Sequence, residues 1–203
     1  MLRPLPETVT LDDVVITEEL SRRSLRPPNL QAENQAMHTL ARQMVNQPET
    51  IIRGLVDMAL DLCNAGTAGV SLLDVTPTGE QVFRWVVLAG ALKQHEGGTT
   101  LRHFSPCGTC LDRDSPQLYS YPGRYFTYFQ AAEAQIVEGL VLPLIANNHP
   151  LGTIWIMSHD EQRHFDPEDV RIMTSLADFT AAALLLNQRQ TKELLAKNAL
   201  LEA

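Results

Sequence analysis

Two apolar segments on either side of a short polar break constrain the fold of this chain most. Residues 139–145 read GLVLPLI and residues 151–157 read LGTIWIM, and Ala146-Asn147-Asn148-His149-Pro150 separates them. Short apolar runs flanking a break rich in Asn and Pro are typical of paired β-strands. The acidic connector 166–169 then leads into a helical pattern that runs from Val170 to the last residue. A hairpin followed directly by one long helix predicts a small module of strands and helices, without a catalytic triad or a nucleotide loop.

The rest of the chain adds helices and strands upstream of this hairpin. Asn29 follows Arg26-Pro27-Pro28 and is expected to cap the first helix. Apolar periodicity and turn residues predict helices at 30–45 and 51–62, strands at 70–75, 82–88 and 118–121, and loops or short helical turns at 90–102, 106–114 and 125–135. This order predicts the α+β class: a central antiparallel sheet of five to six strands, with helices on one face and a long C-terminal helix.

We expect three parts along the chain: an N-terminal extension at 1–29, a folded domain at 30–187 and a coiled-coil linker helix at 188–203. Apolar residues at three-four spacing predict a coiled-coil seam formed by Val170, Met173, Ala177, Leu184, Leu194 and Leu201. Thr180, Asn187 and Thr191 interrupt this seam and weaken it. Because residues 181–186 are apolar on all sides, the helix needs a second partner, which predicts a homodimer through the C-terminal helix. The alternative is a terminal helix that only docks on its own domain.

Composition excludes several classes of function. The 203 residues carry a net charge of −8 without a basic cluster, which argues against a nucleic-acid surface or a polybasic membrane contact. The N-terminus lacks the apolar core of a secretory signal, and the longest apolar stretch is too short to span a bilayer. Three cysteines do not suggest a secreted disulfide framework. We therefore expect a cytoplasmic protein with no membrane contact and no nucleic-acid partner.

Four segments of the chain form a recognisable set: the helix leading into Ala68-Gly69-Val70-Ser71-Leu72, the following hairpin to Trp85, the pair GLVLPLI and PLGTIWIMS, and the entry Phe165-Asp166-Pro167-Glu168-Asp169 into the last helix. Together these segments resemble the GAF family of sensory domains. The resemblance covers roughly residues 40 to 187. Residues 104–108, 111–113 and 122–126 look like a subset found ahead of bacterial sensor histidine kinases. The resemblance implies a dimeric regulatory domain with a ligand pocket between the sheet and the crossover, and output through the C-terminal helix.

A Cys-x-x-C motif at Cys107 and Cys110 offers a second hypothesis. A helix N-terminus lowers the pKa of a thiol, so this pair could act as a redox dithiol or, with His103, as three ligands of a metal sensor. A tetrahedral site needs a fourth ligand, and the chain has no second Cys-x-x-C. Both thiols could equally pack as small apolar groups. The sequence identifies no cofactor.

A methionine-sulfoxide-reductase-like GAF enzyme is the third hypothesis, but the catalytic cysteine expected around 125–132 is missing from YFTYFQAA. Covalent bilin attachment is disfavoured, because no cysteine precedes a histidine. The Asn-Lys-x-Phe pattern of cyclic-nucleotide GAF domains and a phosphate-binding loop are also missing. We therefore expect a non-catalytic domain, the input domain of a bacterial sensor histidine kinase, with a domain that only pairs subunits as a further alternative.

Aromatic residues on two strands and the crossover are the main candidates for a small-molecule pocket. Arg124 could meet an anionic ligand and Asp112 could orient it. Trp155 is the least favoured aromatic, because Ile154 and Ile156 compete for the buried face of its strand. The predicted ligand-binding residues are Trp85, Cys107, Cys110, Asp112, Tyr119, Arg124, Tyr125 and Phe126. The other interpretation of these aromatics is an ordinary hydrophobic core.

Overall fold

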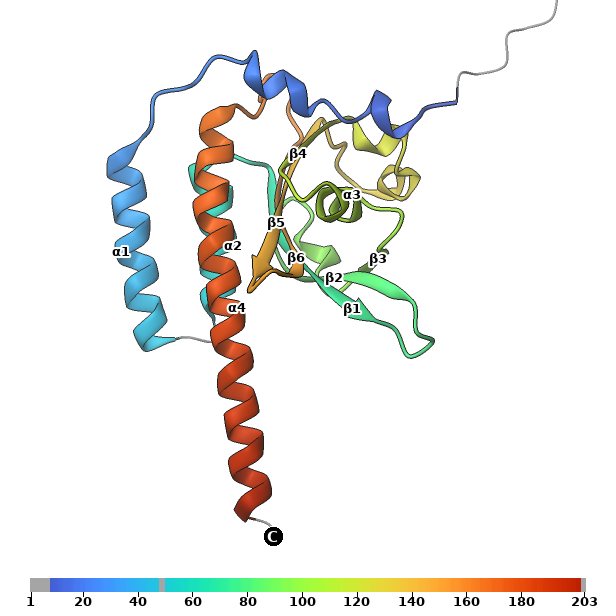
Figure 1. Cartoon of the computed structure of the whole chain (residues 1–203). Helices are drawn as coiled ribbons and strands as arrows, with labels where there is room; N and C mark the ends of the chain where they lie inside the picture. The colour runs from blue at the N-terminus through green and yellow to red at the C-terminus, as the bar shows by residue number, and fades with distance from the viewer. Residues whose placement is uncertain (1–7, 48–49, 202–203) are drawn as a thin grey trace, which may run out of the picture.

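A six-stranded sheet forms the centre of the protein (Figure 1). The computed structural model describes residues 8–47 and 50–201. Its longer elements are α1 (Leu30–Asn46), α2 (Ile51–Leu62), β1 (Thr67–Val75), β2 (Gln81–Gly90), β3 (Thr99–Leu101), α3 (Pro106–Arg113), β4 (Gln117–Ser120), β5 (Glu138–Ala146), β6 (His149–Ser158) and α4 (Pro167–Leu201). Single turns of 3-10 helix are η1 (Leu11–Asp13), η2 (Thr17–Ser21), η4 (Lys93–His95), η5 (Pro122–Arg124) and η6 (Thr127–Ala131).

The strand order is β3-β2-β1-β6-β5-β4, and every neighbouring pair is antiparallel. The hairpin predicted from the two apolar runs is β5–β6, in which Leu142 lies opposite Ile154. Its turn residues Asn147 and Asn148 adopt positive φ angles of 50° and 63°, which Asn tolerates better than most residues. The predicted fold class, an antiparallel sheet of five to six strands with a long C-terminal helix, is confirmed.

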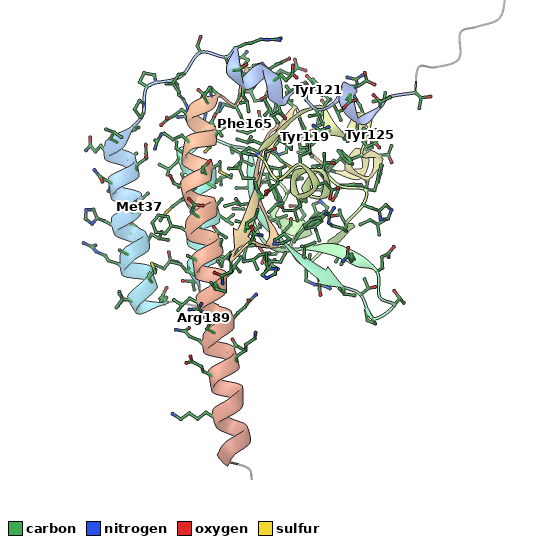
Figure 2. All side chains as sticks on the ribbon, in the orientation of Figure 1. Met37, Tyr119, Tyr121, Tyr125, Phe165 and Arg189 are labelled. Atoms are coloured by element: carbon green, nitrogen blue, oxygen red, sulfur yellow. The ribbon has the colours of Figure 1, made fainter. Side chains whose placement is uncertain are left out.

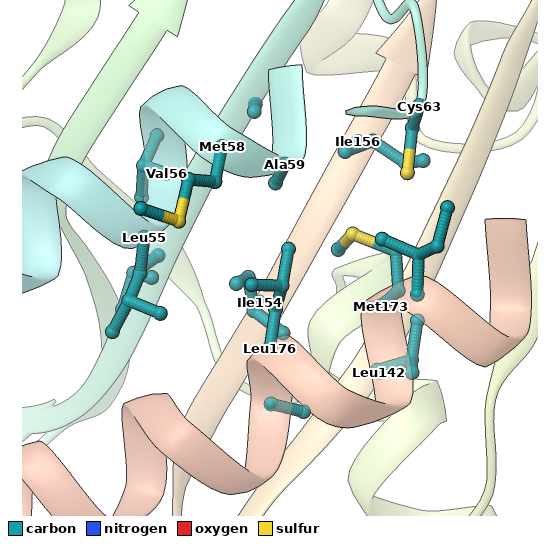
Figure 3. Packing of buried hydrophobic residues seen from close by; sticks show 14 of the residues in the cluster. Leu55, Val56, Met58, Ala59, Cys63, Leu142, Ile154, Ile156, Met173 and Leu176 are labelled. Atoms are coloured by element: carbon teal, nitrogen blue, oxygen red, sulfur yellow. The ribbon is translucent and has the colours of Figure 1, made fainter. Parts of the chain in front are cut away.

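The long helices cover one face of the sheet. Asn29 caps α1 as predicted, because its side chain accepts a hydrogen bond from the amide of Ala32 at 3.1 Å. Helix α1 packs on α2, and α2 and α4 lie directly on the strands (Figure 1). Figure 3 shows the result: apolar side chains of α2 and α4 meet those of β5 and β6, namely Leu55, Val56, Met58, Ala59, Leu142, Ile154, Ile156, Met173 and Leu176. We call this side of the sheet the helix face.

The opposite side, here called the pocket face, is covered by α3, η4, η6 and the loops between them. A second hydrophobic cluster lies there, with Phe83 from β2, Val141 from β5 and Trp155 from β6. Successive side chains of the central strands point to opposite faces of the sheet. On β6, Ile154 and Ile156 belong to the helix-face cluster, and Trp155 belongs to the pocket-face cluster. The sequence predicted helices on one face only, but short helical turns also cover the second face.

Residues 8–29 run along the β4 edge of the sheet to the base of α4. The amide of Ile16 donates to the carbonyl of Leu118 at 2.8 Å, and that of Ser120 donates to Val14 at 2.8 Å. This contact covers the exposed edge of the last strand. Further along, Arg23 forms an ion pair with Glu138 at 2.7 Å, and Arg26 pairs with Asp169. The N-terminal segment therefore links the sheet edge to the start of the long helix.

Two segments differ from their predicted structure or use. The stretch 90–102, predicted as a loop, contains η4 and the edge strand β3, which is too short and polar to show periodicity.

Within the predicted coiled-coil seam, Met173, Ala177 and Leu184 are buried in the helix-face core. The side chains of Leu194 and Leu201 lie outside the described part of the chain. Beyond the sheet α4 projects from the body, where Figure 2 shows Arg189 clear of the other elements.

Candidate functional site

A cavity of about 470 Å³ lies between the pocket face and the segments that cover it. Strands β5 and β6 form its floor, β2 and β3 one side, and α3 and η6 the other. Its lining is mostly aromatic and aliphatic. The lining residues are Trp85, Leu88, Leu92, His95, Thr99, Thr100, Leu101, Phe104, Pro106, Cys107, Thr127, Tyr128, Phe129, Ala131, Ala132, Val141, Trp155 and Met157.

The two tryptophans that line this cavity each pack closely against a glycine. A Cβ atom on Gly69 would lie 2.5 Å from the Trp155 ring, so only glycine lets the indole lie against β1. The Trp155 Nε1 donates a hydrogen bond to the Ser71 hydroxyl at 2.8 Å, which satisfies its buried N–H. Gly98 plays the same part for Trp85, because a Cβ there would come within 2.9 Å of the ring. Both indoles are therefore held in fixed positions at the cavity wall.

Few polar groups face the cavity. None of the lining side chains identified in the described residues carries a permanent charge. The Tyr128 hydroxyl has no hydrogen-bond partner within residues 8–47 and 50–201, and burial raises the pKa of this phenol well above its ordinary value. The Nε2 atom of His95, beside Trp85, is buried and likewise finds no partner in that part of the chain. The three threonines supply the remaining hydroxyls.

The two thiols of the Cys-x-x-C motif lie on α3, and both are buried and free. Ser105 caps this helix by accepting a hydrogen bond from the Gly108 amide at 3.0 Å. Burial nevertheless raises the pKa of Cys107 to about 11, against the smaller effect of the Thr153 and Ser71 hydroxyls. Burial also raises the pKa of Cys110, whose sulfur lies 3.4 Å from the Val141 carbonyl. Both groups are thiols rather than nucleophilic thiolates at neutral pH.

The structure brings two of the eight predicted site residues to the cavity: Trp85 and Cys107. Cys110, Tyr119 and Phe126 are buried in the cluster behind it, and Tyr125 packs against that cluster. Figure 2 shows Tyr119 and Tyr125 on the side of the sheet away from α4. The predicted anion-binding pair is not assembled in the cavity. Asp112 is exposed and pairs with Arg102 at 2.6 Å, while Arg124 is exposed.

Trp155, the aromatic residue least favoured from the sequence, lines the cavity. Its strand β6 lies inside the sheet and is buried on both faces, so Ile154 and Trp155 do not compete for one side. Tyr128 and Phe129, in the aromatic run YFTYFQ, belonged to the aromatic set considered for the pocket but not to the eight predicted ligand-binding residues. His95 was missed, because nothing in the polar segment Lys93-Gln94-His95-Glu96 indicates that this histidine lines a cavity.

A cluster of buried charges lies apart from the cavity, at the base of α4. Glu138 is only 2% exposed, and its carboxylate accepts hydrogen bonds from Arg23 and from the Phe165 amide at 2.9 Å. Burial acts to raise the pKa of Glu138, but the hydrogen bonds from Arg23, Phe165 and His164 outweigh it and lower the pKa. Fully buried Asp169 is held by Arg26 and by Arg163 at 2.8 Å. Each acid has a basic partner, which indicates a structural role.

Among the His, Cys, Asp and Glu side chains of 8–47 and 50–201, no group of three is placed to hold a metal ion. None of the helices in those ranges combines the length and the apolar character needed to cross a bilayer.

Comparisons with known proteins place this architecture. Solved structures that it resembles include the GAF-B domain of DevS from Mycobacterium smegmatis, with 23% identity, a TM-score of 0.58, and 72% of this chain and 99% of that chain covered. A domain of a putative two-component sensor histidine kinase protein from Sinorhizobium meliloti 1021 is 15% identical, with a TM-score of 0.52 and coverages of 75% and 98%. A type II free methionine-R-sulfoxide reductase from Thermoplasma acidophilum is 17% identical, with a TM-score of 0.52 and coverages of 67% and 93%.

At these identities the structural likeness speaks for the fold alone. A comparison with curated proteins finds no match. The sequence itself, however, matches the GAF domain family model over residues 45–185, which is well over half of the chain. This match spans every strand of the sheet, the cavity and the first half of α4. The chain belongs to the GAF domain family.

Proposed function

We propose that this GAF domain is the ligand-binding input domain of a bacterial signalling protein, with the cavity as its ligand site and α4 as its output. The apolar cavity on the face of the sheet opposite α4 carries this proposal. Pockets of roughly 300–1000 Å³ with mainly apolar walls are the usual form of small-molecule sites. Here the pocket shares two strands with the packing surface of the long helix.

The shared strands provide a physical route between the two. On β5, Val141 lines the cavity and the next residue, Leu142, packs in the helix-face core. On β6, Trp155 lines the cavity, and Ile154 meets Leu176 of α4 on the other side (Figure 3). Packed interiors transmit displacements of their atoms. A ligand that displaces β5 or β6 in the cavity therefore changes the packing of α4 on the other face of these strands.

The cavity supports binding rather than catalysis. Its one cysteine has a pKa of about 11, so it does not supply the thiolate that sulfoxide reduction or a thiol sensor needs. The type II free methionine-R-sulfoxide reductase from Thermoplasma acidophilum shares the fold. The second catalytic cysteine is missing from this sequence, which leaves that activity with less support.

Dimerisation through α4 completes the proposal. Phe179 and Leu186 are 42% and 48% exposed on the side of α4 that faces away from the sheet. A second copy of α4 would cover both side chains in a two-fold bundle. The resemblance to a domain of a sensor histidine kinase protein supports such a kinase as the downstream effector. Ligand binding would then shift the packing of two paired helices.

A thermal-shift screen with small molecules of mixed charge tests the ligand site, since a ligand that binds only the folded state raises the Tm. Ala132→Trp fills the cavity from a half-buried position at its wall, and Gln135→Trp adds the same side chain at a nearby exposed position. We expect compounds that stabilise the wild type and Gln135→Trp but not Ala132→Trp. Hydrogen exchange along α4 should change on binding. Absence of any such compound, or an α4 unaffected by one, would contradict the proposal.

A further inference from the structure

We infer that the ligand of this cavity is a neutral, largely aromatic small molecule with one hydroxyl or carbonyl group that forms a hydrogen bond with Tyr128. This inference rests on the proposed function and adds the chemical class of the ligand.

Charge is the first criterion. An ionised group loses its hydration when it enters an apolar cavity, and without a partner there this costs several kcal/mol. Lys, Arg, Asp and Glu do not occur among the described lining residues. The nearby Arg102 is already engaged, because its guanidinium donates to the Gly108 carbonyl at 3.2 Å and to Asp112 at 2.6 Å. Phosphate and carboxylate ligands therefore lack a counter-charge, and ammonium ligands lack an acid.

Shape is the second criterion. Aromatic rings surround the cavity on three sides: Trp155 on the floor, Trp85 on the β2 wall, and Phe104, Tyr128 and Phe129 on the covering segments. The Tyr128 and Phe129 ring centroids lie 4.4 Å apart, and those of Phe104 and Tyr128 lie 6.3 Å apart, so this wall is a continuous aromatic surface. Aromatic rings prefer other rings in offset or edge contacts, which favours a planar ligand over a flexible chain.

The polar contact is the third criterion. Tyr119, a buried phenol nearby, already donates to the Pro106 carbonyl at 3.0 Å. Tyr128 is half-buried at the cavity wall and has no such partner in the described residues, and its raised pKa keeps the hydroxyl protonated at neutral pH. A hydroxyl that lies in an apolar wall and has no protein partner is free to bond a ligand hydroxyl or carbonyl. The unpartnered Nε2 of His95, on the opposite wall, would be met by a polar ligand atom that reaches it.

Three probes with the same ring system and different charge test this class: 2-naphthol (neutral at pH 7), 2-naphthoate and 2-naphthylmethylammonium. We expect calorimetry to show that 2-naphthol binds at least about tenfold more tightly than either ion. Tyr128→Phe should weaken 2-naphthol about three- to tenfold, the size of one hydrogen bond, and leave 2-methylnaphthalene unchanged. Ala132→Trp and, from the opposite side of the mouth, Thr100→Trp should abolish binding, whereas Gln135→Trp should not.

The outcomes separate the two proposals. If an ion binds as tightly as 2-naphthol and the cavity-filling variants abolish its binding, the cavity is a ligand site but the neutral class is wrong. If Tyr128→Phe weakens 2-methylnaphthalene as much as 2-naphthol, the assigned hydrogen bond is wrong. If no naphthalene probe binds but the thermal-shift screen finds another compound that Ala132→Trp excludes, the aromatic class is wrong and the ligand site stands. If neither the probes nor any screened compound bind in a way that the cavity-filling variants block, the ligand site itself fails and the proposed function with it. Circular dichroism of each variant checks that it is folded.

Discussion

The two faces of the sheet use the same strands for different purposes. On the helix face, α2 and α4 present apolar stripes, and side chains such as Leu55 and Met173 are fully buried in one cluster. On the pocket face, α3 and single 3-10 turns cover the strands in short pieces. A short element cannot present a long stripe to a sheet, so gaps remain between the pieces. The helix face therefore holds the larger buried cluster, and the pocket face holds a smaller cluster together with the cavity.

The central strands connect these two environments. Residues 140–142 and 154–157 are buried throughout, with successive side chains on opposite faces. A change in the cavity is therefore one residue away from the packing of α4. Substitutions that affect the two faces differently are the direct test of this division.

Truncation of a core leucine should give the largest contrast between the faces. Leu55→Ala on the helix face should lower the free energy of unfolding by about 3–5 kcal/mol, because it leaves a void in a filled core. Leu92→Ala at the cavity wall should cost about 2 kcal/mol, because it only enlarges an existing space. Urea denaturation measures both values. Equal losses would show that the pocket face is packed as tightly as the helix face.

The charge cluster at the base of α4 should give the next largest effect. Glu138→Gln should lower the stability at pH 7 by about 2–3 kcal/mol, because it removes the charged acceptor of Arg23 and the Phe165 amide. The pKa of Glu138 is lower in the folded protein than its unfolded value of about 4.3. Its contribution is therefore complete above about pH 5 and is lost as the pH falls through the folded pKa.

The variant should show a flatter loss of stability between pH 5 and pH 3 than the wild type, measured by denaturation at each pH. Identical slopes would mean that other carboxylates govern acid unfolding. Since this cluster lies away from the cavity, 2-naphthol binding at pH 7 should be unchanged in Glu138→Gln.

The outer side of α4 should give an effect on association rather than on folding. Phe179→Ser removes a large apolar side chain that is 42% exposed, so the stability of the subunit should change by less than about 1 kcal/mol. If α4 pairs with its copy, the dimer should weaken at least tenfold in sedimentation experiments. Val45→Ser removes an exposed apolar side chain from α1 and serves as the control. A wild type that stays monomeric at all concentrations would remove the proposed output.

The contrast between the faces also explains what the sequence could predict. The β5–β6 hairpin, the Asn29 cap and the helix α2 were predictable, because periodicity and turn chemistry are local signals. The family resemblance implied a pocket between the sheet and the crossover, but its lining was not predictable, because the lining comes from segments between residues 85 and 157 that meet only in the fold. Trp85 and Cys107, predicted by residue type, line the cavity, whereas Asp112 and Arg124, predicted for the same reason, are exposed.

Trp155 shows the limit most clearly. Period-two reasoning assigns one buried face to a strand, and that rule holds for a sheet with one solvated side. Strand β6 is buried on both faces of the sheet. The second face is buried because α3 and η6 cover it, which the residues of β6 alone do not reveal. The aromatic run at 125–129 was interpreted as core or pocket, and the structure divides it: Phe126 is core, while Tyr128 and Phe129 line the cavity.

The smallest effect should come from the cavity thiol. At a pKa of about 11, two units above its ordinary value of 9.0, Cys107 holds about a hundredfold less thiolate at neutral pH than an ordinary cysteine. In a variant with Cys63→Ala and Cys110→Ala, we expect Cys107 to react with an aromatic disulfide reagent at least about a hundredfold more slowly than free cysteine. Cys107→Ser should leave 2-naphthol binding within about threefold of the wild type.

This last measurement separates a binding site from a thiol sensor on the same face. A slow reaction that accelerates only when the protein is unfolded by urea would mean that the packing of α3 protects the sulfur, as its burial requires. A fast reaction in the folded protein, blocked by 2-naphthol, would instead place an accessible thiolate in the cavity. In that case the pocket face would carry covalent chemistry as well as binding, and the division of roles between the faces would have to be redrawn.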